Sequence, residues 1–177
     1  DITGDVETDI WDPEITSRNS SSFVLQIQDA EIQNSTPVKI DITAKDLFEI
    51  IGMQFALDLD GLTLVNFIDG TIDVNQDNFR IDENNRLRFS WNHFEAITGS
   101  AGSVLFSLIV SPIHSGRISD MLSLNDKILN SEMYTGDDAE ITEIEIEMIQ
   151  GVASSSQDQL FQTEPNPFSS TTELRFQ

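Results

Sequence analysis

The chain has 177 residues, enough for one domain of ordinary size with tails and a sizeable core. It carries 31 acidic and 9 basic residues, and the resulting formal net charge of −22 disfavours binding to nucleic acid or anionic lipid. The absence of cysteine excludes disulfides, zinc–thiolate sites and a cysteine nucleophile, and no apolar run approaches the ~20 residues that span a bilayer.

Residues 1–22 are polar and read as a lead-in with little structure of its own. From residue 23 to residue 149, apolar and polar residues alternate with a period of two in repeated short runs, separated by turn signals. The run 104–110 is apolar on both faces, which suits a central strand covered on each side. Helical periodicity is short, a turn or two in 44–51 and in 118–129. This pattern predicts an all-β fold, an antiparallel β-sandwich.

The predicted core consists of the apolar positions of these alternating runs. A solvent-exposed Trp91 would mean that the register of its strand is wrong, since a slip of one residue reverses every side chain. The predicted core residues are Phe23, Leu25, Ile40, Ile42, Phe55, Leu57, Phe89, Trp91, Phe106, Leu108, Ile144 and Ile146.

An acidic row, Glu143, Glu145 and Glu147, lies on one face of a predicted strand. Arg86 and Arg88 form the only matching basic row, so these two strands are candidates for neighbours in the sheet. A plain solvated face is the alternative interpretation of the acidic row.

The sequence offers little for catalysis. His93 and His114 fall in different segments and are too few for a catalytic zinc site. Ser115 follows His114, but there is no Gly-x-Ser-x-Gly motif, and serine and aspartate are frequent enough for such neighbours to arise by chance. We therefore predict no catalytic residues and no enzyme activity.

Calcium is the one cofactor that the acidic loops favour. Residues 58–61 (DLDG) are similar to part of an EF-hand loop, but the register places Ala56 and Phe67 where the first and last calcium ligands are required. We interpret Asp58 as an outward-facing strand residue and Asp60-Gly61 as a hairpin turn.

The remaining candidate metal ligands lie in two loops. Asp73 and Asp77 belong to one of them, and Asp137 and Asp138 belong to the other. Carboxylate and carbonyl oxygens are the ligands that calcium prefers, while a solvated acidic loop without an ion is the alternative interpretation.

The body of the chain, about 23–149, resembles the cohesin-like modules of large Bacteroidetes surface proteins. Five segments carry the resemblance, in the family's order. They are 38–44 (VKIDITA), 51–60 (IGMQFALDLD), 85–92 (NRLRFSWN), 101–108 (AGSVLFSL) and 140–149 (EITEIEIEMI), with a departure after residue 60. Residues 1–6 (DITGDV) are similar to the end of a dockerin-type repeat. The resemblance implies a jelly-roll sandwich of about nine strands, related in fold to carbohydrate-binding modules.

The C-terminal residues 165–177 resemble the opening of the type IX secretion C-terminal sorting domain, through the turn 166–168 (NPF) and the strand-like stretch 171–176 (TTELRF). This resemblance implies export to the outer surface of a Gram-negative bacterium, with the protein attached to the cell or released. A proline-punctuated loop followed by an edge strand is the plain alternative. Residues 150–164 read as a linker, and we expect the whole to be a piece of a longer protein.

Together these resemblances imply a non-catalytic structural or adhesive module that works through protein–protein contacts. The expected partners are other copies or neighbouring domains of the same surface assembly. A glycan-binding module of a secreted protein is the alternative, although sugar platforms need exposed aromatic side chains. Trp91 is predicted to be buried, which leaves Trp11 in the lead-in as the free tryptophan.

Overall fold

The computed structural model describes residues 21–136 and 140–150. The lead-in before residue 21, the linker after residue 150 and the sorting segment 165–177 lie outside these residues. The strands are β1 (Phe23–Asp29), β2 (Glu31–Ile32), β3 (Val38–Ala44), β4 (Phe48–Leu59), β5 (Leu62–Asp69), β6 (Phe79–Ile81), β7 (Arg86–Gly99), β8 (Val104–Pro112), β9 (Gly116–Arg117), β10 (Leu122–Leu124), β11 (Glu132–Thr135) and β12 (Glu140–Gln150). Two short helices, η1 (Gln76–Asn78) and α1 (Ile118–Met121), complete the described elements.

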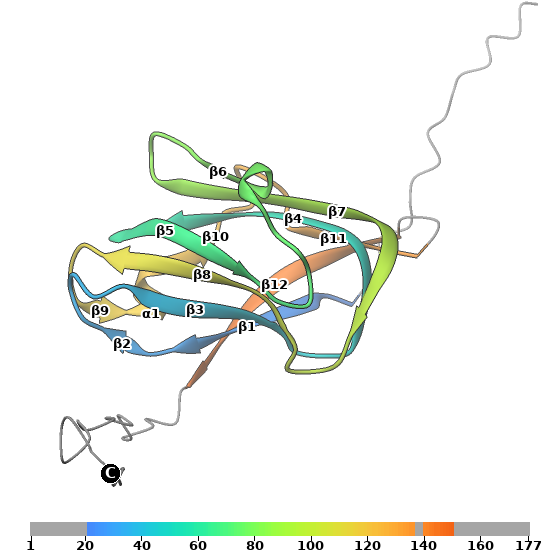
Figure 1. Ribbon diagram of the computed structural model, residues 1–177, viewed down its shortest axis with the longest axis horizontal. Coiled ribbons are helices and arrows are strands. Elements are labelled where there is room, and N and C mark those ends of the chain that lie inside the picture. Colours follow the sequence, from blue (N-terminus) through green and yellow to red (C-terminus); the bar gives the residue numbers. More distant parts are fainter. Residues whose placement is uncertain (1–20, 137–139, 151–177) are drawn as a thin grey trace, which may run out of the picture.

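The strands form a curled sheet folded into two layers (Figure 1). One layer runs β5-β8-β3-β1-β12, and the other runs β12-β11-β4-β7-β6 with β10 beside β4. The continuous path from β5 to β6 contains nine strands, which agrees with the expected jelly-roll sandwich of about nine strands. Strands β2 and β9 form a separate small pair.

Strand β12 belongs to both layers (orange in Figure 1). Its first residues, up to Glu143, pair antiparallel with β11, and from Ile144 onward it pairs parallel with β1. The sandwich is antiparallel as predicted, and the β1–β12 pair is the parallel exception among the described strands. A parallel pair needs a long crossover, and here the rest of the sandwich supplies it, because β1 is the first strand and β12 the last.

Phenylalanine rings from both layers meet in the core. Phe89 of β7 lies 4.7 Å from Phe106 of β8 and 5.1 Å from Phe79 of β6, measured between ring centroids. Phe67 of β5 stacks on Phe79 at 4.4 Å. The predicted core residues are confirmed as buried, except Ile146, which is half-buried and packs against the core. The central strand predicted for 104–110 is confirmed as β8, which lies between β5 and β3.

The turn Asp60-Gly61 was predicted to be a hairpin turn, and this is wrong. Gly61 has φ +71°, as a tight turn requires, but β4 and β5 on its two sides belong to different layers and do not pair. The turn is a corner between sheets, because β4 finds its partners in β7, β10 and β11 while β5 pairs with β8.

Of the two segments predicted to hold a helical turn or two, the one in 44–51 is wrong and the one in 118–129 is confirmed for a single turn. Residues 44–51 contain the end of β3, a bend and the start of β4. In 118–129 only α1, four residues long, is helical before β10 begins. Pairing in the sheet overrides the helical periodicity of these short segments, because hydrogen bonds between strands satisfy the backbone groups that a helix would otherwise satisfy.

The predicted pairing of the acidic and basic rows is wrong. β7, with Arg86 and Arg88, pairs with β4 and β6, whereas the acidic strand β12 pairs with β1 and β11. Arg86 instead bonds Asp82 four residues earlier, at 2.7 Å. Glu147 lies 3.2 Å from Lys45, in the bend after β3, and accepts a hydrogen bond from Gln26 of β1.

Candidate functional site

The most unusual surface feature of the described sandwich is a distortion where β7 runs beside the start of β4. Ile50 lies opposite Ile97 and Gly52 lies opposite Asn92, so the single residue Ile51 faces the four residues 93–96. Extra residues in one strand push it away from its neighbour and turn side chains outward. Phe94, in the middle of this stretch, is 98% exposed.

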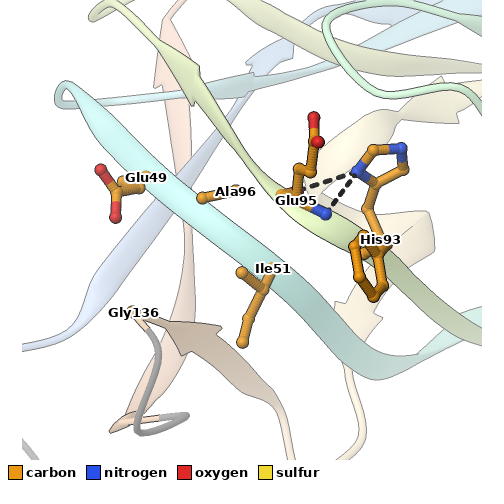
Figure 2. A pocket seen from close by; sticks show the side chains of 7 residues that line it. Glu49, Ile51, His93, Glu95, Ala96 and Gly136 are labelled. Carbon is orange, nitrogen blue, oxygen red and sulfur yellow. Dashed lines mark hydrogen bonds between the residues drawn. The ribbon is translucent and has the colours of Figure 1, made fainter.

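His93 stabilises the distorted stretch. Its Nδ1 atom lies 2.8 Å from the carbonyl oxygen of Glu95 and 3.2 Å from the backbone nitrogen of Glu95 (dashed lines in Figure 2). A protonated Nδ1 donates to the carbonyl, and an unprotonated Nδ1 accepts from the N–H. The imidazole also lies parallel to the Trp91 ring, with 6.1 Å between centroids and 6° between planes. The residues around Phe94 are therefore held in a defined conformation.

A hollow of about 560 Å³ adjoins Phe94. Figure 2 shows its lining side chains from β7 and β4, with Gly136 just after β11. The lining residues are Glu49, Ile51, His93, Phe94, Glu95, Ala96 and Gly136. A second hollow of about 370 Å³ shares Ile51 and His93 and extends to Trp91 and Tyr134. We call the surface formed by Ile51, His93, Phe94, Ala96 and Tyr134 the Phe94 face.

A buried carboxylate supports one side of the Phe94 face. Glu132 is 9% exposed and accepts hydrogen bonds from the Tyr134 hydroxyl at 2.9 Å and from Gln54 at 3.3 Å. Burial raises the pKa of Tyr134, and the hydrogen bond to Glu132 and the negative charge of Glu132 raise it further. Tyr134 is therefore held as a neutral donor with a fixed orientation.

The face combines apolar and acidic character. Phe94, Ile51 and Ala96 supply apolar surface, and the carboxylates of Glu49 and Glu95 stand beside it. Such a surface can bury an apolar side chain of a partner and attract a neighbouring cation.

The candidate metal ligands are only partly within the described residues. Asp73 offers its carbonyl oxygen to Trp91, and the backbone nitrogen of Asp77 donates to the side chain of Asn75, both near the start of η1. Asp137 and Asp138 lie outside the described residues. Within residues 21–136 and 140–150, no group of three or more acidic or histidine side chains comes together as a metal site.

The histidine–serine neighbours do not form a nucleophile and a base. The Ser115 hydroxyl accepts a hydrogen bond from the backbone nitrogen of Asn34, and the Nδ1 atom of His114 lies 3.4 Å from the carbonyl oxygen of Ser115. Trp91 is 5% exposed and so is not a sugar platform, and Trp11 lies outside the described residues. Asp58 faces outward as predicted, and its carboxylate accepts both of its hydrogen bonds from Asn125.

Solved structures of cohesins share this architecture. A non-cellulosomal cohesin from the archaeon Archaeoglobus fulgidus has a TM-score of 0.51 and 11% identity, over 71% of this chain and 86% of that chain. The cohesin of the Coh-OlpC–Doc435 cohesin–dockerin complex from Clostridium thermocellum has a TM-score of 0.51 and 12% identity, over 71% and 89%. The fold is that of a cohesin module.

A further structure is the sixth cohesin of scaffoldin B from Acetivibrio cellulolyticus, in complex with a Cel5 dockerin mutant. Its TM-score is 0.50 at 17% identity, over 73% of this chain and all of that chain. No protein-family model matches the chain, and no curated protein matches it. At these identities the likeness shows the fold alone.

Sequence reasoning missed the Phe94 face, although a signal was present. In β7 the buried residues Leu87, Phe89 and Trp91 occupy odd positions, and Phe94 breaks this alternation by standing at an even one. A large aromatic residue on the wrong phase of a strand indicates either an exposed anchor or a shift of register. Here Phe94 is exposed, and the register shifts beside it.

Proposed function

We propose that this chain is a non-catalytic assembly module that binds a protein partner through the Phe94 face. The observation that carries the proposal is the exposure of Phe94, 98%, on a stretch of strand that His93 holds in place beside a hollow. A large aromatic side chain exposed on an ordered strand is typical of an interface anchor, because its ring has few rotatable bonds and loses little entropy on binding.

The partner that fits best is a dockerin-type module of the same surface assembly. Two solved structures of similar fold are complexes of a cohesin with a dockerin, which supports a partner of this kind. The similarity of residues 1–6 to the end of a dockerin repeat agrees with a system that uses both modules. No observation on the described residues favours the glycan-binding alternative.

The proposal extends to location. An exported surface protein of a Gram-negative bacterium, delivered by type IX secretion, is supported by the resemblance of residues 165–177 to the start of a sorting domain. Within the described residues, no helix has both the length and the apolar character to cross a membrane. Protease digestion of intact cells of the source organism, followed by immunoblotting, tests the location. Protection of the protein until the cells are lysed would contradict surface export.

Calorimetric titration of the purified chain with dockerin modules from the same genome tests the binding function. We expect one or more modules to bind, and Phe94→Ala to weaken binding by about 2 kcal/mol or more, roughly thirtyfold. Ile113→Ala is the matched control, because Ile113 is 63% exposed and does not line the hollow. Equal affinities for the wild type and Phe94→Ala would show that Phe94 is not part of the interface.

A further inference from the structure

Strand β5 is an open edge of the sandwich. It is eight residues long and heads the sheet order, so among the described residues its only strand partner is β8. An edge strand of this length presents a row of backbone N–H and C=O groups that another strand can pair with. The opposite edge, β6, has only three residues and carries Arg80, which limits pairing there.

The surface around β5 has almost no charge, although the chain as a whole has a net charge of −22. Residues 61–68 and 96–116, which contain most of β5 and all of β8, include no Asp, Glu, Lys or Arg. The one charged residue of the two strands is Asp69, and its Oδ1 atom accepts a hydrogen bond from the backbone nitrogen of Val74 at 2.8 Å. Two copies of this chain therefore repel each other least at this edge.

Apolar side chains are exposed on the same strand. Val65 is 58% exposed and Ile68 is 44% exposed. The register against β8 shifts between Leu64 and Asn66, so Val65 is the extra residue of a bulge. β5 contains neither lysine nor proline, two features that often protect an edge strand from pairing. A bulge is a third such feature, but here it is confined to Val65, and the register stays regular over residues 66–69, where we expect the pairing.

We propose that two copies of this chain pair through β5. Antiparallel pairing of a strand with its own copy is self-complementary about a two-fold axis, and it joins the β5-β8-β3-β1-β12 layers of the two molecules into one continuous sheet. The pairing satisfies the open backbone groups of both edges and covers Val65 and Ile68. The Phe94 face, which lies on the other layer, stays free for its own partner.

The charge distribution also determines how the dimer responds to salt. Away from the β5 edge, the two molecules of a dimer carry the same strong negative charge and repel each other. Added salt screens this repulsion without weakening the backbone hydrogen bonds of the β5 edge. Self-association through β5 should therefore strengthen as the salt concentration rises, whereas an interface held by ion pairs would weaken.

Sedimentation velocity of the full chain, over a range of protein and sodium chloride concentrations, tests the proposal. We expect a monomer–dimer equilibrium that shifts toward dimer with salt. The double variant Val65→Lys with Ile68→Lys should raise the dissociation constant roughly tenfold or more. The matched control is Ile81→Lys with Ile149→Lys, which changes two exposed residues outside β5 and alters the net charge by the same amount as the β5 double variant. This control should not weaken the dimer.

Two further variants keep the test independent of folding defects and of the proposed function. Because the chain has no cysteine, Ile68→Cys should give an oxidised covalent dimer faster than Ile81→Cys does. Phe94→Ala should leave the dimer unchanged. A chain that stays monomeric at all concentrations would overturn the proposal. This holds even if the β5 edge pairs with a strand of another protein. A dimer that the β5 lysines do not weaken would also overturn the proposal.

Discussion

The indole nitrogen of Trp91 donates a hydrogen bond to the backbone carbonyl oxygen of Asp73 at 3.0 Å. Trp91 lies in β7 and is 5% exposed, whereas Asp73 lies in the connection that leads from β5 to η1 and β6. A single side chain therefore fills part of the core and fastens a connection between the two layers. Two residues farther along the same strand, His93 is exposed, and its ring lies parallel to the indole.

Trp91→Ala should lower the free energy of unfolding by about 3–5 kcal/mol, because it removes a large buried side chain. Trp91→Phe should cost less, since the ring volume is largely kept but the carbonyl of Asp73 loses its donor, a loss of about 1–2 kcal/mol. Urea denaturation of the wild type and both variants measures the difference. A smaller loss for the alanine variant than for the phenylalanine variant would contradict this account.

Asp29, 5% exposed, anchors the segment that contains β9 and α1. Its Oδ2 atom accepts a hydrogen bond from Nη2 of Arg117 at 2.7 Å, and its Oδ1 atom accepts from the backbone nitrogen of Ser119 at 3.1 Å. Asp29→Asn should lower stability near neutral pH by about 1–3 kcal/mol, because it removes charge-assisted hydrogen bonds while Arg117 remains partly solvated.

The same carboxylate predicts a pH dependence. Burial raises the pKa of Asp29, but the hydrogen bonds from Arg117 and Ser119 outweigh it and hold the pKa below its ordinary value of 3.8. The stabilisation is therefore complete above the unfolded pKa and is lost as the pH falls through the folded pKa. The difference in melting temperature between the wild type and Asp29→Asn should stay constant as the pH is lowered from about 7 toward the unfolded pKa. It should then narrow as the pH falls further, toward about 3. A difference that widens in acid would contradict this sign.

Tyr134 should titrate above its ordinary pKa of 10.0, because burial and the hydrogen bond to Glu132 both disfavour the phenolate. Tyr134 is the single tyrosine of the chain, so tyrosinate absorbance reports its pKa directly. Since the folded pKa is raised, the stability that Tyr134 contributes is present below the unfolded pKa and is lost as the pH rises through the folded pKa.

Glu132→Gln should lower the pKa of Tyr134 toward its ordinary value, with the contribution of burial remaining. Glu145→Gln on β12 is a suitable control, because Glu145 lies opposite Val24 in the other layer and should leave the titration unchanged. If the pKa of Tyr134 is the same in the wild type and Glu132→Gln, the hydrogen bond does not control the titration.

Calcium binding in the acidic loops stays a prediction. We expect calcium, but not magnesium at equal ionic strength, to raise the melting temperature, because an ion that binds only the native loops stabilises the fold by mass action. The response should vanish in Asp73→Asn with Asp77→Asn or in Asp137→Asn with Asp138→Asn, and the pair of substitutions that abolishes it identifies the loop that binds the ion. Identical curves with calcium and with chelator would leave these loops as solvated surface.

The alternation of apolar and polar residues was enough to predict the layers of the fold. Phe55, Phe89 and Phe106 stand at apolar positions of three separate runs, and all three are buried where the layers meet. The period of two determines which side of each strand faces the core, so the residues of the core follow from the sequence.

Strand partners were not predictable in the same way. The opposite charges of Arg86 and Glu143 suggested neighbouring strands, yet β11 and β4 lie between the strands that carry them. A surface charge pair contributes too little energy to decide the order of strands in a sheet. The parallel pairing of β1 with β12 was missed for a related reason, because nothing within either strand encodes a contact between the two ends of the domain.

The sequence by itself determined the all-β class, the faces of the strands and the acidic, cysteine-free surface, because these depend on composition and on neighbours one or two residues apart. Only the tertiary structure decided that Ile51 faces the four residues 93–96 and that Phe94 is exposed beside a hollow. It also decided that β5, with few charged residues, lies at an edge of the sheet. Register and edges arise from pairing between segments that are distant in sequence. The surfaces proposed for binding are therefore products of the fold.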